Sequence, residues 1–154
     1  MSLTIRRATD RDVSAIIAIE QQELTAAHWK ADEYQKRLTD GCLMVAESEG
    51  RVCGFICARG VLDDWDIENL VVAVTFRRRG IAGELIRALM RESQNRSGAA
   101  WLLEVRESNL AARALYEKHG FLEVGRRHGY YREPAEDALL FEYRLGDDQD
   151  SAGS

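Results

Sequence analysis

The chain has 154 residues, of which 45% are hydrophobic and 31% charged, with 12 glycines and a single proline. This length suits one domain with its own core, and the composition excludes a low-complexity, collagen-like or wholly disordered chain. The formal net charge is −5, and the three aspartates of the tail 147–154 supply −3, so the −2 left on the body argues against general nucleic-acid binding.

Cysteine content and the N-terminal sequence bear on the compartment. The chain has three cysteines, an odd number, at Cys42, Cys53 and Cys57. They form no C-x-x-C motif, and the histidines of the chain do not cluster. They indicate neither a disulfide framework nor a zinc site, so a reducing cytosol is the expected compartment. The charged N-terminus lacks an apolar core, and no apolar stretch approaches the roughly 18 residues of a membrane span, which predicts neither secretion nor membrane insertion.

The first elements are a strand and two helices. Residues 3–6 alternate at period two, which is typical of a strand. Thr9 and Asp12 offer a capping-box start to a helix whose apolar face comprises Val13, Ile16, Ile17 and Leu24. A second, shorter helix is predicted around Trp29, Tyr34 and Leu38, and Asp40-Gly41 ends it.

A β-hairpin and a buried strand come next. Residues 43–47 and 52–59 flank a turn at 48–51, which predicts the hairpin. After a turn at Asp63-Asp64, the apolar run over 65–74 predicts a strand that is buried on both faces at its end and central in a sheet.

The second half of the chain alternates helices and strands. The expected elements are a helix over 81–97, a strand over 101–105, a helix over 109–119, a strand over 121–127, a polar aromatic loop over 130–136 and a final strand over 138–144. The order is β-α-α-β-β-β-α-β-α-β-β. It predicts an α/β fold with a mixed sheet and helices on both faces, in a single domain over 1–146 followed by a disordered tail over 147–154.

The segment 69–83 carries the first chemical signal. Its buried strand runs into a turn with Gly80, Ala82 and Gly83, and the turn opens a helix whose first N–H groups lack intrahelical partners. Such a helix start binds anions, because small residues let a diphosphate approach and the helix dipole favours its charge. Alternatively, the arginines at 77–79 are an ordinary solvated run before a turn. The segment is neither a P-loop nor a G-x-G-x-x-G motif.

The pattern Arg77-x-x-Gly80-x-Ala82 after a buried strand resembles the [QR]-x-x-G-x-[GA] pyrophosphate motif of the GCN5-related N-acetyltransferases (GNAT), which bind acetyl-CoA. A second block is similar to the RimI-like branch, the ribosomal-protein alanine N-acetyltransferases, namely the run from Leu103 to Phe121, L-E-V-R-E-S-N-L-A-A-R-A-L-Y-E-K-H-G-F. Two departures bear on acetyl-CoA affinity. Ala73-Val74 stands where the branch commonly has Asp-Pro, and Arg77 replaces the commoner Gln.

Roles follow from this resemblance. It implies that Glu104 is the general base, acting through water, and that Tyr116 is the general acid that protonates the CoA thiolate. Tyr130, Tyr131 and Arg132 are expected to shape the slot for the substrate. Acetyl-CoA binding is expected at Leu70, Val71, Val72, Arg77, Arg78, Arg79, Gly80, Ile81, Ala82, Gly83, Asn109 and Tyr116.

Each of these residues also has a purely structural interpretation. Glu104 is also interpretable as the charged end of a core strand, paired with Arg106 or Arg113, and Tyr116 as a core aromatic with a bonded hydroxyl. Asn109 is a natural helix cap, a role compatible with cofactor contact. The histidines show no triad spacing, and the cysteines are more typical of small core residues than of nucleophiles.

The resemblance implies an acetyl-CoA-dependent N-acetyltransferase that transfers acetyl directly, in a ternary complex, to the α-amine of a protein N-terminus. An Ala-starting small-subunit ribosomal protein is the implied acceptor, in the cytoplasm. Metal, membrane and direct nucleic-acid partners are not expected, and the residues do not indicate an oligomeric state. The alternatives are acetylation of a small-molecule amine or a Lys side chain, and a non-catalytic acetyl-CoA-binding sensor or interaction domain.

Overall fold

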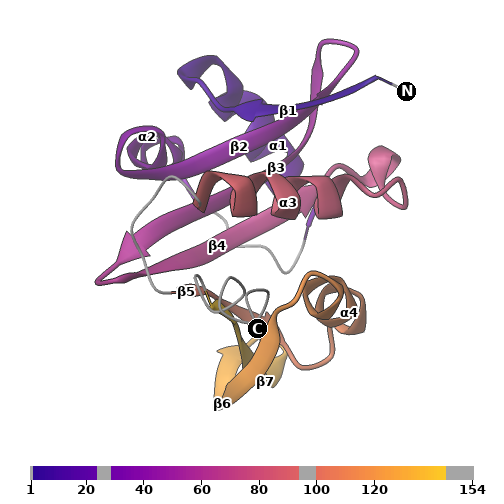
Figure 1. The fold of residues 1–154 in the computed structure, drawn as a ribbon. Helices are drawn as coiled ribbons and strands as arrows, with labels where there is room; N and C mark the ends of the chain where they lie inside the picture. The colour runs from indigo at the N-terminus through magenta and orange to yellow at the C-terminus, as the bar shows by residue number, and fades with distance from the viewer. Residues whose placement is uncertain (1, 24–28, 94–99, 145–154) are drawn as a thin grey trace, which may run out of the picture. The chain divides into compact units, whose positions relative to one another are not determined.

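The computed structural model describes residues 2–23, 29–93 and 100–144. The tail 147–154, the expected end of the third helix at 94–97, His28 and Leu24 lie outside the described residues. The chain divides into two compact units, the first comprising Met1–Gly60 and Ile67–Arg96 and the second Val61–Asp66 and Ser97–Ser154. Figure 1 labels their elements.

The order of elements agrees with the sequence prediction. In chain order they are β1 (Leu3–Arg7), α1 (Val13–Glu20), α2 (Ala31–Asp40), β2 (Gly41–Ser48), β3 (Arg51–Val61), β4 (Asp64–Val72), α3 (Ile81–Ser93), β5 (Ala100–Arg106), α4 (Leu110–Lys118), β6 (Leu122–Arg132) and β7 (Ala135–Arg144). Short 3-10 turns at Asp10–Asp12 and Val74–Phe76 precede α1 and follow β4.

The first unit is built on antiparallel strands. β1 pairs with β2 from Leu3 opposite Ser48, and β2 pairs with β3 from Gly41 opposite Arg59. The predicted capping box is confirmed, because the Asp12 carboxylate accepts the Thr9 N–H at 2.7 Å. Asp12 is also held by Arg6, whose guanidinium lowers the pKa of that carboxyl.

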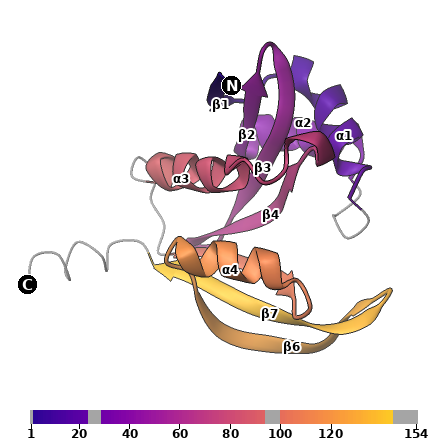
Figure 2. The same cartoon turned by 90° about the vertical axis from the view of Figure 1, so that its right-hand side faces the viewer.

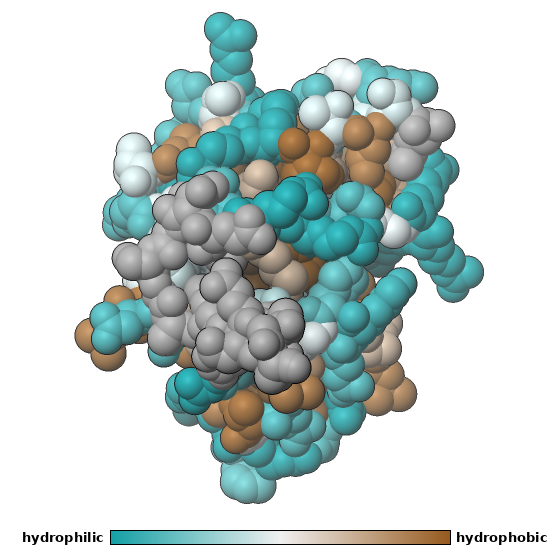
Figure 3. All heavy atoms as spheres, in the orientation of Figure 1, coloured by the Kyte–Doolittle hydropathy of each residue, from teal (hydrophilic) through white to brown (hydrophobic). Residues whose placement is uncertain are grey.

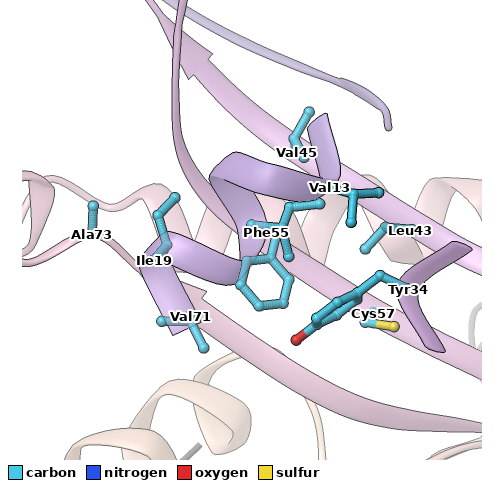
Figure 4. Packing of buried hydrophobic residues seen from close by; sticks show 10 residues of the cluster. Val13, Ile19, Tyr34, Leu43, Val45, Phe55, Cys57, Val71 and Ala73 are labelled. Carbon is cyan, nitrogen blue, oxygen red and sulfur yellow. The ribbon is translucent and has the colours of Figure 1, made fainter. Parts of the chain in front are cut away.

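Helices cover both faces of this sheet (Figure 2). On one face, Phe55 and Cys57 of β3 pack with residues of α1 and α2, in the cluster shown in Figure 4. On the other face, a Cβ built on Gly54 would lie 3.4 Å from the side chains of Ile81 and Leu85 in α3. The strand alternation therefore gives each face its own helix contacts, and glycine at 54 permits the close approach of α3.

The second unit is a three-stranded antiparallel arrangement with one helix. β7 lies between β5 and β6, pairing Ala100 with Arg144 on one side and Leu122 with Glu142 on the other. Tyr116 of α4 packs against Phe121 and Phe141. Most side chains of β6 are exposed, and the large hydrophobic residues Leu122 and Val124 are among them. Figure 3 shows the protein surface in the orientation of Figure 1, where hydrophilic residues predominate.

Two predicted boundaries were wrong. The expected loop over 130–136 is a hairpin, because Tyr130–Arg132 belong to β6 and β7 already begins at Ala135. The strand predicted to reach Val74 ends at Val72, since the Phe76 N–H bonds the Ala73 carbonyl at 2.9 Å and closes a turn. These two boundaries do not change the fold class, and the expected α/β class is confirmed. No helix among the described residues is long and apolar enough to cross a membrane.

Candidate active site

The end of β4 and the start of α3 carry the predicted cofactor residues of the first unit. Val71 is buried, and Leu70 and Val72 are half-buried. The Ala73 N–H donates to the Cys53 carbonyl at 2.8 Å, which ties the end of β4 to β3. The backbone of the predicted pantetheine strand is therefore fixed in place by its neighbour within this unit.

The three arginines between β4 and α3 have different surroundings. Arg77 donates to the Val72 carbonyl at 3.1 Å and to the Glu23 carboxylate at 3.2 Å. The Arg79 guanidinium lies 5.3 Å from the centre of the Phe76 ring. Arg78 is exposed and adopts a φ of 65°, in the left-handed region. All three are exposed, so their charges remain accessible to an anion.

The start of α3 has the features of an anion site. The Glu84 N–H bonds the Gly80 carbonyl at 3.1 Å, so the N–H groups of residues 81–83 precede the helical ladder. Gly80 adopts a φ of 77°, and a Cβ there would meet nothing within 4 Å. Glycine therefore suits the backbone conformation at position 80, and the space beside it is open. Ile81 and Gly83 are buried and Ala82 is half-buried.

In the second unit, Glu104 lies on β5 among aromatic and basic partners. Its carboxylate is 3.1 Å from the Arg127 Nε, and its side chain is 27% exposed. The Tyr130 hydroxyl donates to the same carboxylate, whose charge raises the Tyr130 pKa. The structural alternative placed Glu104 in a pair with Arg106 or Arg113. Glu104 instead forms an ion pair with Arg127, and part of its carboxylate remains accessible.

Tyr116 is a buried residue of α4, at 8% exposure. Burial raises the pKa of its phenol, and the charge of a Tyr131 phenolate adds to the rise. Within the part of the chain that the structure describes, no group accepts or donates a hydrogen bond at the Tyr116 hydroxyl. The hydroxyl is thus protonated at neutral pH and uncommitted within these residues.

The remaining predicted residues of this unit lie at the start of α4 and at the end of β6. The Asn109 side chain caps α4 by accepting the Ala112 N–H at 3.1 Å. Tyr130 and Tyr131 meet edge to face with centroids 5.1 Å apart. Burial and the Glu104 charge raise the pKa of Tyr131 to about 12. Arg132 is exposed, and it lies opposite Ala135 in the antiparallel pairing of β6 with β7, next to the turn.

Sequence reasoning missed one set of residues here. Arg106 lies over the Tyr131 ring, 4.2 Å from its centre, and bonds Glu136 at 3.1 Å. Arg106 stands in the Leu103–Phe121 block that carries the family resemblance, which was the available signal for it, whereas Glu136 lies outside that block. Their partnership joins positions 30 apart in the chain, so no local pattern predicts it.

Other candidate groups take structural roles. Cys42, Cys53 and Cys57 are buried, and burial raises the thiol pKa of Cys53 and Cys57. The His119 ring nitrogen contacts the Leu115 carbonyl, and the exposed His128 contacts Asp137. No group of three or more potential metal ligands occurs within residues 2–23, 29–93 and 100–144.

Comparison with known proteins gives consistent results. A family model described as the acetyltransferase (GNAT) family matches residues 10–121. The [ribosomal protein bS18]-alanine N-acetyltransferase of Escherichia coli K12 is 32% identical over 140 residues, which cover 89% of this chain and 94% of that protein. The counterpart from Salmonella typhimurium is 38% identical over 95 residues, covering 60% of this chain and 64% of that protein.

Solved structures show the same fold. The crystal structure of the ribosomal-protein-S18-alanine N-acetyltransferase from E. coli superposes with a TM-score of 0.83 at 30% identity, covering 94% of each chain. Arabidopsis thaliana NAA60 in complex with acetyl-CoA gives a TM-score of 0.84 at 23% identity, covering 94% of this chain and all of that one, and this likeness concerns the fold alone.

Proposed function

Since the chain belongs to the GNAT acetyltransferase family, we propose that it transfers acetyl from acetyl-CoA to the N-terminal α-amine of a protein in the cytoplasm. The acceptor is an Ala-starting small-subunit ribosomal protein, a proposal supported by the similarity to bacterial bS18-alanine N-acetyltransferases. We assign this activity to a single domain over 1–146. The observation that carries it is the partly exposed Glu104 carboxylate beside Tyr130, within the matched block.

The first unit supplies the residues for acetyl-CoA. The N–H groups of Ile81, Ala82 and Gly83 at the start of α3 receive the diphosphate, with Gly80 leaving room for it. Arg77, Arg78 and Arg79 add positive charge. The β4 backbone at Leu70, Val71 and Val72 pairs with the pantetheine as an added strand would. The family resemblance also assigns Asn109 and Tyr116 to acetyl-CoA binding. The bound molecule supplies an activated acetyl thioester.

Glu104 serves as the general base, through water. An α-amine has a pKa of about 7.7 to 8.0, whereas the Lys side chain has about 10.4, so a carboxylate removes a proton from an α-amine more readily. The Tyr130 hydroxyl and the Arg127 guanidinium hold the carboxylate in a defined orientation. The site chemistry therefore favours a protein N-terminus over a Lys side chain.

Tyr116 serves as the general acid. Its raised pKa keeps the hydroxyl protonated at neutral pH, so a proton is available for the departing thiolate. Transfer is direct, because the three cysteines are buried, and burial disfavours the thiolate that an acyl-enzyme would require. Holding amine and thioester together supplies the rate advantage by proximity.

The test compares acceptors and variants. Purified protein is incubated with acetyl-CoA and short peptides whose α-amine is free or blocked, with and without Lys, and CoA release and product mass are recorded. We expect acetylation of free Ala-starting N-termini. Glu104→Gln should lower kcat by about 10²- to 10⁴-fold, the usual contribution of a general base.

Glu142→Gln is the matched control, because Glu142 pairs with Arg144 on β7 and takes no part in the proposed chemistry. Acetylation of Lys side chains or of a small amine in place of α-amines would contradict the acceptor assignment. Acetyl-CoA binding without any turnover would favour a sensor.

A further inference from the structure

The Arg106 side chain bonds the turn at the tip of the β6–β7 hairpin. It leaves the end of β5, and its Nη1 donates to the Pro134 carbonyl at 3.0 Å and to Glu136 at 3.1 Å. Its Nη2 donates to the Glu133 carbonyl at 3.3 Å. The side chain is only 13% exposed. One guanidinium therefore binds both residues of the hairpin turn and the strand that follows.

Glu136 extends this contact to the start of α4. Its carboxylate accepts the Ser108 N–H at 2.9 Å and the Ser108 hydroxyl at 3.0 Å, and these bonds lower its pKa. The carboxylate thus stays ionised and bridges Arg106 to the residue just before the α4 cap. The turn of the hairpin is tied to the segment between β5 and α4 by charge-assisted bonds.

The backbone of the hairpin does not fix the tyrosines by itself. The register between β6 and β7 shifts between Arg127 and Tyr131, so regular pairing is interrupted where Tyr130 lies. Side chains take over this function. The Arg106 guanidinium packs on the Tyr131 ring, Tyr131 meets Tyr130 edge to face, and the Tyr130 hydroxyl reaches Glu104.

Arg106 also carries a cost. Its Nε is buried without a hydrogen-bond partner among the residues that the structure describes. A buried donor left unpaired destabilises the folded state, and the Nη bonds and the ring contact offset this cost. A hydrophobic side chain would avoid this cost but could not bind the turn carbonyls and Glu136.

We propose that Arg106 is a positioning residue for acceptor recognition, which latches the 133–136 turn and thereby sets Tyr131 and Tyr130 beside Glu104. This inference rests on the proposed function. The Arg106 guanidinium acts on the hairpin, and most residues that we assign to acetyl-CoA lie at the end of β4 and the start of α3, so its loss affects the acceptor and leaves the affinity for acetyl-CoA unchanged.

The experiment measures the KM for an Ala-starting peptide, the KM for acetyl-CoA and kcat in wild-type protein and in Arg106→Gln, Arg106→Lys and Arg144→Gln. We expect Arg106→Gln to raise the peptide KM roughly 10-fold or more, the value of a charge-assisted bond, with the acetyl-CoA KM unchanged. Arg106→Lys restores charge without the planar fork and recovers part of the affinity. Arg144→Gln, which removes an exposed arginine of β7, leaves all three constants unchanged.

Glu136→Gln identifies the partner. It should raise the peptide KM in the same direction, and the double variant with Arg106→Gln should be little worse than Arg106→Gln alone, because both changes open the same latch. Equal increases in the KM values for peptide and acetyl-CoA, or fully additive effects of the two substitutions, would overturn the proposal.

Hydrogen exchange of the amides of 129–137 gives a readout that does not depend on turnover. Faster exchange in Arg106→Gln than in wild-type or Arg144→Gln protein is expected, and unchanged exchange would overturn the latch. Faster exchange together with a wild-type protein that acetylates no peptide would show that the proposed function has failed while the latch exists. It would overturn the assignment of Arg106 to acceptor recognition.

Discussion

Each unit buries one tyrosine on a helix, and the two hydroxyls have opposite surroundings. Tyr34 of α2 is fully buried, donates to Glu20 and accepts from the Asn69 side chain at 3.3 Å. Tyr116 of α4 is nearly as buried, yet its hydroxyl has no hydrogen-bond partner among the residues described. Burial raises the pKa of both phenols.

The difference separates a hydroxyl that is bonded within the fold from the hydroxyl that we propose as the general acid. The Tyr34 hydroxyl satisfies a buried carboxylate, so its removal acts on the folded state. The Tyr116 ring already packs with Phe121 and Phe141, and its hydroxyl adds no bond to that packing. Aromatic burial alone does not distinguish the two, whereas the hydrogen-bond partners of the hydroxyl do.

The largest effect is expected from Tyr116→Phe. The change keeps the ring and removes the proton donor, so kcat for acetyl transfer should fall by about 10²- to 10⁴-fold. The free energy of unfolding should change by less than about 0.5 kcal/mol, because no bond to a described residue is lost. CoA release and urea denaturation measure the two quantities on the same preparation. A large loss of stability with kcat preserved would mean that the Tyr116 hydroxyl stabilises the fold, as the Tyr34 hydroxyl does, and is not the general acid.

Tyr34→Phe should show the reverse pattern. Glu20, only 1% exposed, loses a donor and the Asn69 amide loses an acceptor, which should cost about 1–3 kcal/mol of unfolding free energy. The Glu20 carboxylate still accepts a hydrogen bond from the Trp29 N–H at 2.9 Å, so it retains one hydrogen-bond donor in the variant. With acetyl-CoA and peptide saturating, kcat of the folded fraction should match wild type. A drop in kcat comparable to that of Tyr116→Phe would break the comparison.

Sequence patterns predicted the parts of the fold where strand-like runs flank a clear turn. The runs 43–47 and 52–59 flank the turn at 48–51, and this arrangement correctly indicated the hairpin of β2 and β3. β6 lacks such a pattern, since nearly every side chain is exposed, and Tyr130–Arg132 therefore resembled a loop. At Val74 the prediction extended β4 too far. This residue is apolar, as a buried strand residue would be, but it lies beyond the end of β4 and is 53% exposed.

The site was predictable to the extent that it is local. Gly80 and the start of α3 follow from a turn within a short segment, and Asn109 caps the helix that it precedes. The contacts of Arg106 with Glu136, and of Glu104 with Arg127, join strands that the chain brings together only after folding. Their partners depend on the register of β5, β7 and β6, which no single segment encodes.

Alkaline pH should sharpen the comparison of the tyrosines. A phenol is neutral when protonated, and burial raises both pKa values above the ordinary value of about 10, so the folded state holds these protons more tightly than the unfolded state. Their contribution to stability is complete below pH 10 and is lost as the pH rises further. Urea denaturation at pH 9, 10 and 11 should show a smaller loss for either Phe variant than for wild type, and parallel curves would contradict this linkage.

The smallest effects are expected in the exposed turn before α3, where no buried hydroxyl is involved. Gly80→Ala places a Cβ at a φ of 77° and should cost about 1 kcal/mol through backbone strain alone, because the added atom meets nothing within 4 Å. Arg78→Gly relieves strain at a φ of 65° but gives the unfolded chain more freedom, so the two terms should cancel to within about 0.5 kcal/mol.

Arg78→Gly therefore isolates the charge of this arginine from the stability of the turn. Its affinity for CoA, measured by calorimetry, should fall by about 2- to 5-fold, the value of an exposed ion pair, while Arg91→Gln on the exposed face of α3 leaves the affinity unchanged. An equal loss in both variants would mean that the net charge near α3 matters and that Arg78 has no specific contact. An unchanged affinity in Arg78→Gly would leave the diphosphate to the backbone of 81–83, the part of the site that no side-chain variant removes.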